Sequence, residues 1–213
     1  MKTIQKEISI WLHLIIFIVI WIALLIFTKA GLNINWQALK QLPNTVSVYL
    51  ILRIIFTQWI WRWSIFRGWL VRFPDLQGTW EGQLKTTWRD PKTGKIPSPI
   101  SLIIVIKQSY DSIICTMQTE ESSSTSGAIL LNEDEKSEVF YLSYLYLNKS
   151  DPIIRERSRI HDGAAVLQVI KTPKRKLKGE YWTNRMTTGS IEVKFRSYRL
   201  EEEFPERLKR GRI

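Results

Sequence analysis

The segment from residue 177 to residue 196 (LKGEYWTNRMTTGSIEVKFR) contains the side chains best suited to binding chemistry. Strand alternation places five of its residues on one face: Leu177, Gly179, Tyr181, Thr183 and Arg185. This face begins apolar and becomes polar toward a turn, so we expect it to point into a core. A buried guanidinium is costly without an anionic partner, and arginine beside hydroxyls and a stacking ring suits a phosphate that carries a base. Pairing of Arg185 with an acidic side chain at the rim remains the alternative.

Four residues outside this face complete the candidate binding site: Trp88, Tyr141, Arg159 and Thr187. Thr187 begins the turn that follows the strand, and Trp88 alternates in phase with Trp80. Tyr141 belongs to a tyrosine-rich segment, in which alternation places it opposite to Tyr144 and Tyr146. Arg159 ends a run of alternating arginines. That run is either a solvated basic stripe or a rim that attracts anions.

The chain lacks the residue patterns of an enzyme. Its two histidines, His13 and His161, are far apart in the sequence, and its single cysteine, Cys115, has no histidine nearby. No Cys/His cluster has metal-ligand spacing, no Ser/His/Asp set is apparent, and no glycine-rich phosphate loop occurs. One cysteine also excludes an internal disulfide. We therefore expect no catalytic residues, no metal ion and no cofactor.

The elements that would position these residues alternate with strand periodicity from Pro74 onward. Eight strands are predicted over residues 76–88, 99–108, 112–120, 125–131, 137–147, 160–170, 176–185 and 188–200. The connections are short, so neighbouring strands must be antiparallel. Eight antiparallel strands in one layer usually close into a barrel with space for one small ligand. We predict an all-β ligand-sensing domain over residues 74–200, an eight-stranded antiparallel up-and-down β-barrel.

The triplet Gly78-Thr79-Trp80 near the start of this domain resembles the Gly-x-Trp of lipocalin-like barrels. In such barrels the tryptophan plugs one end and packs near a late arginine. Arg196 or Arg199 is the candidate for that arginine here. The simpler interpretation, that Trp80 is an ordinary core residue, remains open.

Residues 1–73 have a different character. Two apolar segments, about 8–28 and 46–66, predict an N-terminal hairpin of two transmembrane helices, because about 20 apolar residues cross a bilayer. This part holds eight Lys/Arg against one acid, and seven of the ten tryptophans, a pattern typical of membrane interfaces. The basic residues slightly favour both termini in the cytoplasm. Residues 201–213 form a charged C-terminal tail.

The second apolar segment carries polar groups that recur near helical spacing. Arg62 and Gln58 lie on one stripe, and Arg53 and Thr57 share a neighbouring face. Polar side chains in a membrane helix tend to face protein or water, so these four residues are predicted to drive membrane assembly into a homo-oligomer. The alternative is that both arginines reach the lipid headgroups from opposite ends of the helix.

As a whole, the chain resembles the membrane-bound, β-strand-rich effectors of bacterial anti-phage CBASS immunity, the STING-like transmembrane β-barrel effectors. The resemblance covers the architecture of the entire chain. At motif level it rests on Leu76-Gln77-Gly78-Thr79-Trp80-Glu81-Gly82 and on Gly179-Glu180-Tyr181-Trp182-Thr183-Asn184-Arg185.

This resemblance implies a function. A partner nucleotidyltransferase would make a cyclic dinucleotide, the barrel would bind it, and the helices would assemble and breach the bacterial inner membrane. The infected cell would then die before phage mature. The resemblance also implies a multi-pass protein of the inner membrane, with its barrel in the cytoplasm and the lipid bilayer as a partner.

Two other functions fit the same residues. A membrane-tethered, lipocalin-like carrier of a lipid or fatty acid would also use a barrel, with a single arginine holding a carboxylate. A scaffold with a filled barrel would bind another protein through its surface. DNA or RNA is not an expected partner, because most of the net charge of +11 lies in residues 1–73.

Overall fold

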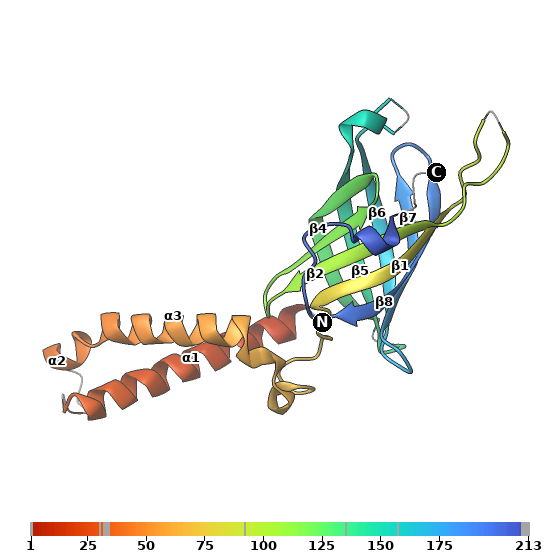
Figure 1. Ribbon diagram of the computed structural model, residues 1–213. Coiled ribbons are helices and arrows are strands. Elements are labelled where there is room, and N and C mark those ends of the chain that lie inside the picture. The colour runs from red at the N-terminus through yellow and green to blue at the C-terminus, as the bar shows by residue number, and fades with distance from the viewer. Residues whose placement is uncertain are drawn as a thin grey trace. The chain divides into compact units, whose positions relative to one another are not determined.

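The computed structural model describes residues 2–29, 31, 35–91, 93–134, 136–156 and 158–209, without the side chains of residues 2–10. The last four residues of the predicted tail, 210–213, lie outside this description. The chain divides into two compact units, residues 1–66 and residues 67–213. Each unit is described by itself below, and Figure 1 labels the elements of both.

The first unit is a helical hairpin. It contains α1 (Lys2–Phe27), α2 (Trp36–Leu39), α3 (Leu42–Gln58) and the 3₁₀ turns η1 (Ile60–Arg62) and η2 (Ser64–Phe66). Helices α1 and α3 meet through Tyr49, whose hydroxyl lies 3.1 Å from His13 Nδ1 and whose ring packs edge-on against Phe17. The indole of Trp21 donates a hydrogen bond to the carbonyl of Ala38. Two helices are thus confirmed.

The second helix is shorter than predicted. It ends at Gln58, and 17 residues span only about 25 Å, against about 30 Å of hydrocarbon. Arg62, which sequence spacing placed on this helix, lies in η1 and donates to the carbonyl of Gln58. Within the described part of the chain, neither helix combines the length and the apolar character that crossing a membrane requires. The structure therefore does not support the prediction of two membrane-spanning helices at 8–28 and 46–66.

The second unit is a closed barrel of antiparallel strands in sequential order, as predicted. Its strands are β1 (Gly78–Thr86), β2 (Ile100–Gln108), β3 (Ile113–Thr119), β4 (Ser122–Asp134), β5 (Val139–Ser150), β6 (His161–Ile170), β7 (Lys176–Thr183) and β8 (Thr188–Ser197). Each strand pairs with its chain neighbour, and β8 returns to β1. Figure 1 shows the sheet curling on itself. The seam between β3 and β4 is the shortest, because these strands pair only from Thr116 to Gln118 and from Ser123 to Thr125.

The interior of the barrel is filled by alternate residues of every strand. Leu102, Ile104 and Ile106 of β2 are fully buried, and Leu142 of β5 and Leu167 of β6 face them across the core. This cluster continues from one end of the barrel to about the middle of the strands. Strand alternation therefore set the inward face correctly, since period-2 patterning fixes which residues enter a core.

The segment that precedes β1 closes one end of the barrel. Leu76 is buried there, its N–H donates to the side chain of Gln108, and its carbonyl accepts from the indole of Trp80. The guanidinium of Arg175, from the β6–β7 turn, lies 5.2 Å from the Trp80 ring and 3.9 Å from that of Phe195. The arginine beside the tryptophan is therefore Arg175, and the prediction of Arg196 or Arg199 is wrong. Arg175 lies in a turn, where strand alternation does not indicate the direction of a side chain.

The C-terminal residues 199–209 form a strap across the outside of the barrel. Thr79 on β1 donates to the carbonyl of Arg199 and accepts from the N–H of Glu201, and Gln118 on β3 donates to the carbonyl of Glu202. Strand β2 lies between these contacts, and its outward side chains Ile103 and Val105 are buried. Figure 1 shows this blue segment running over the strands.

Candidate functional site

The interior of the barrel changes character toward the end opposite to Leu76. We call this the polar end, and its inward side chains are Thr86, Ser124, Tyr146, Asn148, His161 and Thr183. Register brings them together, because Asn148 lies opposite both Ser124 and His161, and Tyr146 and Thr183 flank Gly163. A polar rim over an apolar floor can hold a ligand with both characters.

Two tyrosines form the wall where the polar and apolar parts meet. A Cβ atom added at Gly163 would lie 2.4 Å from Cζ of Tyr146, and one added at Gly189 would lie 2.6 Å from Cε1 of Tyr181. Both rings therefore lie directly on backbone that only glycine provides. Burial raises the pKa of Tyr146 to about 12, and proximity to Tyr181 adds to that rise. Both phenols remain neutral donors at physiological pH.

Thr183 organises the turn between β7 and β8. Its hydroxyl lies 2.7 Å from that of Thr187, and it accepts hydrogen bonds from the backbone N–H groups of Arg185 and Thr187. Side-chain to backbone bonds of this kind favour a tight turn. Thr183 thus fixes the turn that carries Arg185.

Arg185 is exposed at the polar end and links two loops. One of its terminal nitrogens donates to the carbonyl of Arg159, in the β5–β6 connection, over 3.4 Å. Within the described residues it forms no ion pair with a carboxylate, so the predicted alternative of an acidic partner at the rim is not found. A guanidinium has five N–H donors, and most of them remain available to an anion.

His161 adds a titratable group beside this arginine. Its Nδ1 lies 3.0 Å from the carbonyl of Arg159, which makes Nδ1 the protonated nitrogen and directs Nε2 away from that carbonyl. Burial lowers the pKa of His161 below its usual value; the Arg159 carbonyl opposes the shift, and Arg185 adds to it. An anion bound here would favour the protonated ring and reverse the shift.

Two further polar side chains at this end have unused hydrogen-bonding capacity. The hydroxyl of Ser124 is buried and has no partner within the described residues. Asn148 is 5% exposed, and its amide forms no hydrogen bond to any described residue. Buried polar groups normally have partners, so both are available to a ligand or to water.

The structure brings six of the seven predicted ligand-binding residues to the polar end. Tyr181 and Thr183 face the interior, Arg185 and Thr187 lie in the following turn, and Arg159 meets Arg185. Trp88 is exposed just beyond β1, beside the first residues of β8, since the N–H of Thr87 donates to Thr188. Tyr141 is not with them, because it points outward from the opposite end of β5.

Sequence reasoning missed Tyr146, Asn148, His161, Ser124 and Thr86. Alternation alone would have found Tyr146, since it shares a face with the buried Phe140 and Leu142. The pairing of Asn148 with His161 could not be predicted from the sequence. Ten residues connect β5 to β6, and a connection of that length does not define the register between the two strands.

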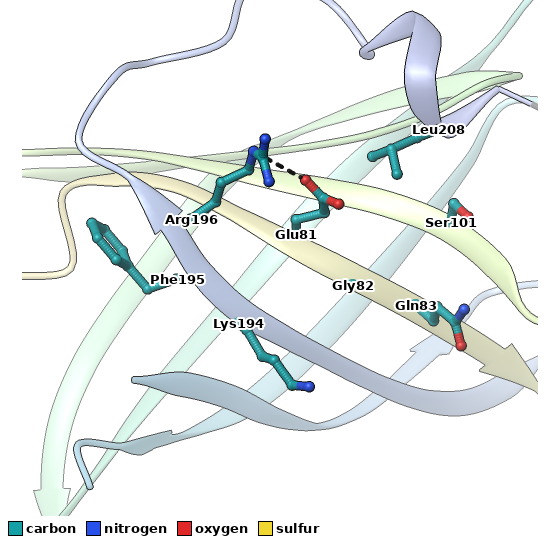
Figure 2. Close-up of a pocket in the computed structure, with 8 residues that line it drawn as sticks. All are labelled: Glu81, Gly82, Gln83, Ser101, Lys194, Phe195, Arg196 and Leu208. Carbon is teal, nitrogen blue, oxygen red and sulfur yellow. Dashed lines mark ion pairs between the residues drawn. The ribbon is translucent and has the colours of Figure 1, made fainter. Parts of the chain in front are cut away.

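An open hollow of about 410 Å³, which we call the outer hollow, lies on the outside of the barrel. Figure 2 shows Glu81, Gln83, Lys194 and Arg196 of β1 and β8 around it, with Leu208 of the strap above. Glu81 forms ion pairs with Arg196, at 3.3 Å, and with Arg207 of the strap. The Glu81 carboxylate is thus already paired with two guanidinium groups, and its ion pair with Arg207 holds the strap at this hollow.

The four residues predicted for membrane assembly have mixed positions in the helical unit. Arg53 and Gln58 are exposed, whereas Thr57 is buried and donates its hydroxyl to the carbonyl of Ile54 in its own helix. Arg62 stacks over Trp61, with its guanidinium 4.7 Å from the ring. Thr57 and Arg62 are therefore engaged locally.

The single cysteine, Cys115, is buried in the core beside the hydroxyl of Tyr144. Burial raises the pKa of its thiol to about 12. A thiol of this kind is a poor nucleophile. Among the described residues, no group of three or more His, Cys, Asp or Glu could hold a metal ion.

A closed barrel of eight antiparallel strands either fills its interior with side chains or holds one small ligand. Residues 71–195 match the family of the cyclic dinucleotide receptor domain of Cap15. This match covers more than half of the chain, so the chain belongs to that family.

Two relatives extend the similarity beyond the barrel. The CD-NTase-associated protein 15 of Staphylococcus schleiferi is 24% identical over 179 residues, which are 84% of this chain and 91% of that protein. The protein of the same name from Escherichia albertii is 27% identical over 164 residues, or 73% of this chain and 80% of the relative.

Proposed function

We propose that this chain is an effector of bacterial CBASS anti-phage defence whose barrel senses a cyclic dinucleotide made by a partner nucleotidyltransferase. The observation that carries the proposal is the polar end. There, an arginine with no carboxylate partner among the described residues, a half-buried histidine and two tyrosines lie at the end that also holds the buried hydroxyl of Ser124, which has no hydrogen-bond partner among those residues. Membership of a cyclic dinucleotide receptor family supports the same ligand.

Each part of the ligand has a counterpart in the site. Arg185, with His161 when protonated, would bind phosphate oxygens through charge-assisted hydrogen bonds. The rings of Tyr146 and Tyr181 would pack against a base, and Asn148 would read its edge. A fatty acid offers one carboxylate and no hydrogen-bonding base, so it would leave Asn148 and Ser124 unsatisfied. The lipid-carrier function is therefore second.

The helical unit would carry the response. Many of its large apolar side chains are exposed, including Trp11, Ile15, Val19, Phe27, Ile51 and Ile54. Contiguous apolar surface of this extent marks a site of contact with a membrane or a partner. The effector would use it at the bacterial inner membrane, with its barrel in the cytoplasm, to assemble into oligomers, disrupt the bilayer and cause abortive infection. Ligand must then bind the assembled state more tightly than the resting state.

A thermal-shift panel on the full-length chain in detergent tests the ligand. Some cyclic dinucleotide among the purine and pyrimidine combinations should raise the melting temperature, because binding to the folded state alone stabilises it. Arg185→Ala should weaken binding about 10- to 100-fold, since one charge-assisted hydrogen bond contributes about 1.5–3 kcal/mol.

Arg196→Ala is the matched control, since it removes an arginine from the outer hollow, and it should leave affinity unchanged. A melting temperature that no cyclic dinucleotide moves, but that a fatty acid raises, would replace the proposal with the lipid-carrier function.

A further inference from the structure

One seam of the barrel wall is weaker than the others. Strands β3 and β4 share three residue pairs, whereas every other two neighbouring strands share at least seven. Next to these three pairs, on the side of the closed end, the N–H of Cys115 donates to the hydroxyl of Ser126, so a side chain takes the place of a ladder bond. Beyond that point β4 continues along β5, and within the described residues it has no ladder to β3. A short ladder opens at low free energy, so this seam is the part of the wall that parts most readily.

The core is less completely covered along this seam than elsewhere. Ile113 of β3 and Ile129 and Leu131 of β4 pack against the core, yet each stays partly exposed. Leu142, on the neighbouring strand β5, is completely buried. The bulge at Gly127 lies where the ladder to β3 stops, and a bulge allows a strand to bend. Strand β4 therefore has a bending point beside its weakest ladder.

The inner side chains of the polar end are closed to solvent. Ser124 is 3% exposed, Tyr146 5%, Tyr181 6% and Thr183 8%. A nucleobase is much larger than the water molecule from which these side chains are already shielded. A base can therefore reach them only if the wall of the barrel moves.

The loops around the polar end are tied to one another. The N–H of Asp151, in the β5–β6 connection, donates to the carbonyl of Glu121 in the β3–β4 turn. Arg185, in the β7–β8 turn, donates to the carbonyl of Arg159 in the same β5–β6 connection. Three loops are thereby joined at this end, which favours the β3–β4 seam as the part of the wall that gives way.

We propose that the seam between β3 and β4 is a side gate, which parts to admit the ligand and re-forms around it. Ser124 lies in the middle of the three pairs and faces the interior, opposite to Asn148 of β5. A ligand that gives the Ser124 hydroxyl a hydrogen-bond partner would hold β4 in place once the gate has closed. The gate rests on the proposed function for the identity of its ligand, whereas the opening of the seam can be measured without any nucleotide.

Hydrogen exchange of the ligand-free, full-length chain in detergent gives the first test. The amides that join β3 to β4, within residues 116–118 and 123–125, should exchange at least about tenfold faster than those that join β7 to β8 within residues 179–181 and 189–191. The two sets lie at a similar depth below the polar end, but the second belongs to a ladder of seven pairs. Exchange of both sets at one rate would mean that the seam opens only with the whole barrel, and would overturn the proposal.

A disulfide across the seam gives the second test. Thr116 and Thr125 are cross-strand neighbours that point outward, so Thr116→Cys/Thr125→Cys can form a bridge that locks the gate. The probe is the cyclic dinucleotide that raises the melting temperature most in the thermal-shift panel. Oxidation should slow its association and its dissociation by at least about tenfold each and leave Kd within about twofold, because a gate changes rates and not the bound state.

The matched control is a bridge at a similar depth in a long ladder. Glu180 and Ser190 are outward neighbours on β7 and β8, and oxidation of Glu180→Cys/Ser190→Cys should change neither rate. Cys115 is buried and points inward from β3, so it stays in all variants. Rates that oxidation of the Thr116→Cys/Thr125→Cys variant leaves unchanged would overturn the gate, and so would a Kd that rises while dissociation stays the same.

A single substitution that weakens the seam gives the third test. Ser126→Ala removes the hydroxyl that accepts from the N–H of Cys115, and it should speed association and dissociation by about two- to tenfold at an unchanged Kd. Unchanged rates in this variant would also contradict the gate. If no cyclic dinucleotide binds to the unmodified chain, the proposed function fails, and the exchange of the ligand-free chain still decides whether the seam opens.

Discussion

Replacing Arg175 with alanine should destabilise the closed end of the barrel. Its guanidinium lies over the ring of Phe195 at 3.9 Å, near Trp80 at 5.2 Å and near Tyr198 at 5.6 Å. It also donates to the carbonyl of Asp75 at 2.6 Å and to the hydroxyl of Tyr198 at 3.1 Å. One side chain thus joins the entry segment, β1 and β8.

The magnitude follows from these contacts. A partly desolvated cation–π contact contributes about 0.5–2 kcal/mol, and a hydrogen bond from a charged donor contributes about 1.5–3 kcal/mol. Because such terms overlap, we expect Arg175→Ala to lower the free energy of unfolding by about 2–4 kcal/mol. For a chain of this size, the melting temperature should fall by about 6–12 °C.

The assay is thermal unfolding of the full-length chain in detergent, followed by the circular dichroism of the β-sheet. Arg196→Ala is the matched control, because its ion pair with Glu81 is exposed and Arg207 remains to satisfy the carboxylate. That variant should lose less than about 1 kcal/mol. If Arg196→Ala destabilises the barrel as much as Arg175→Ala, the assignment of the closing arginine is refuted.

Three further predictions concern the polar end. Stability should fall as pH drops from 7 to 5, because the lowered pKa of His161 means that the unfolded chain binds the proton first; His161→Asn should flatten this pH dependence in denaturant titrations. Gly163→Ala should weaken nucleotide binding and destabilise the barrel by about 1–3 kcal/mol in calorimetry, since its Cβ would collide with the Tyr146 ring; an unchanged affinity would contradict the placement of that ring. Thr183→Val should loosen the turn and speed hydrogen exchange at Arg185, whereas Thr183→Ser should not.

The barrel followed from the sequence because alternation and short connections leave few other folds. Every predicted strand exists, and most bounds agree within two or three residues. The largest difference is β4, which runs from Ser122 to Asp134 and carries a bulge at Gly127. The prediction missed three residues at each end of β4, and the missed start is the serine run Ser122–Ser124, because small polar residues have low strand propensity.

The candidate site was predictable only where alternation could be counted along one strand. Tyr181 and Thr183 share β7, so their common inward face needed no knowledge of register. The prediction that Arg185 continues this face is wrong, because β7 ends at Thr183 and Arg185 lies exposed in the turn that follows. Alternation placed Tyr141 on the face opposite to Tyr144 and Tyr146, and the structure shows that this face is the outer one. The sequence did not predict the end of α3 at Gln58. The tryptophan-rich residues that follow are as apolar as those of α3, and hydropathy does not distinguish an α-helix from a 3₁₀ turn.

The most direct measurement of the central claim is hydrogen exchange of the full-length chain with and without saturating cyclic dinucleotide. Binding at the polar end predicts slower exchange in the β7–β8 turn around Arg185 and near His161, with no change in the entry segment at Leu76. Protection confined to the outer hollow, at Gln83 and Lys194, with the polar end unchanged, would contradict the account.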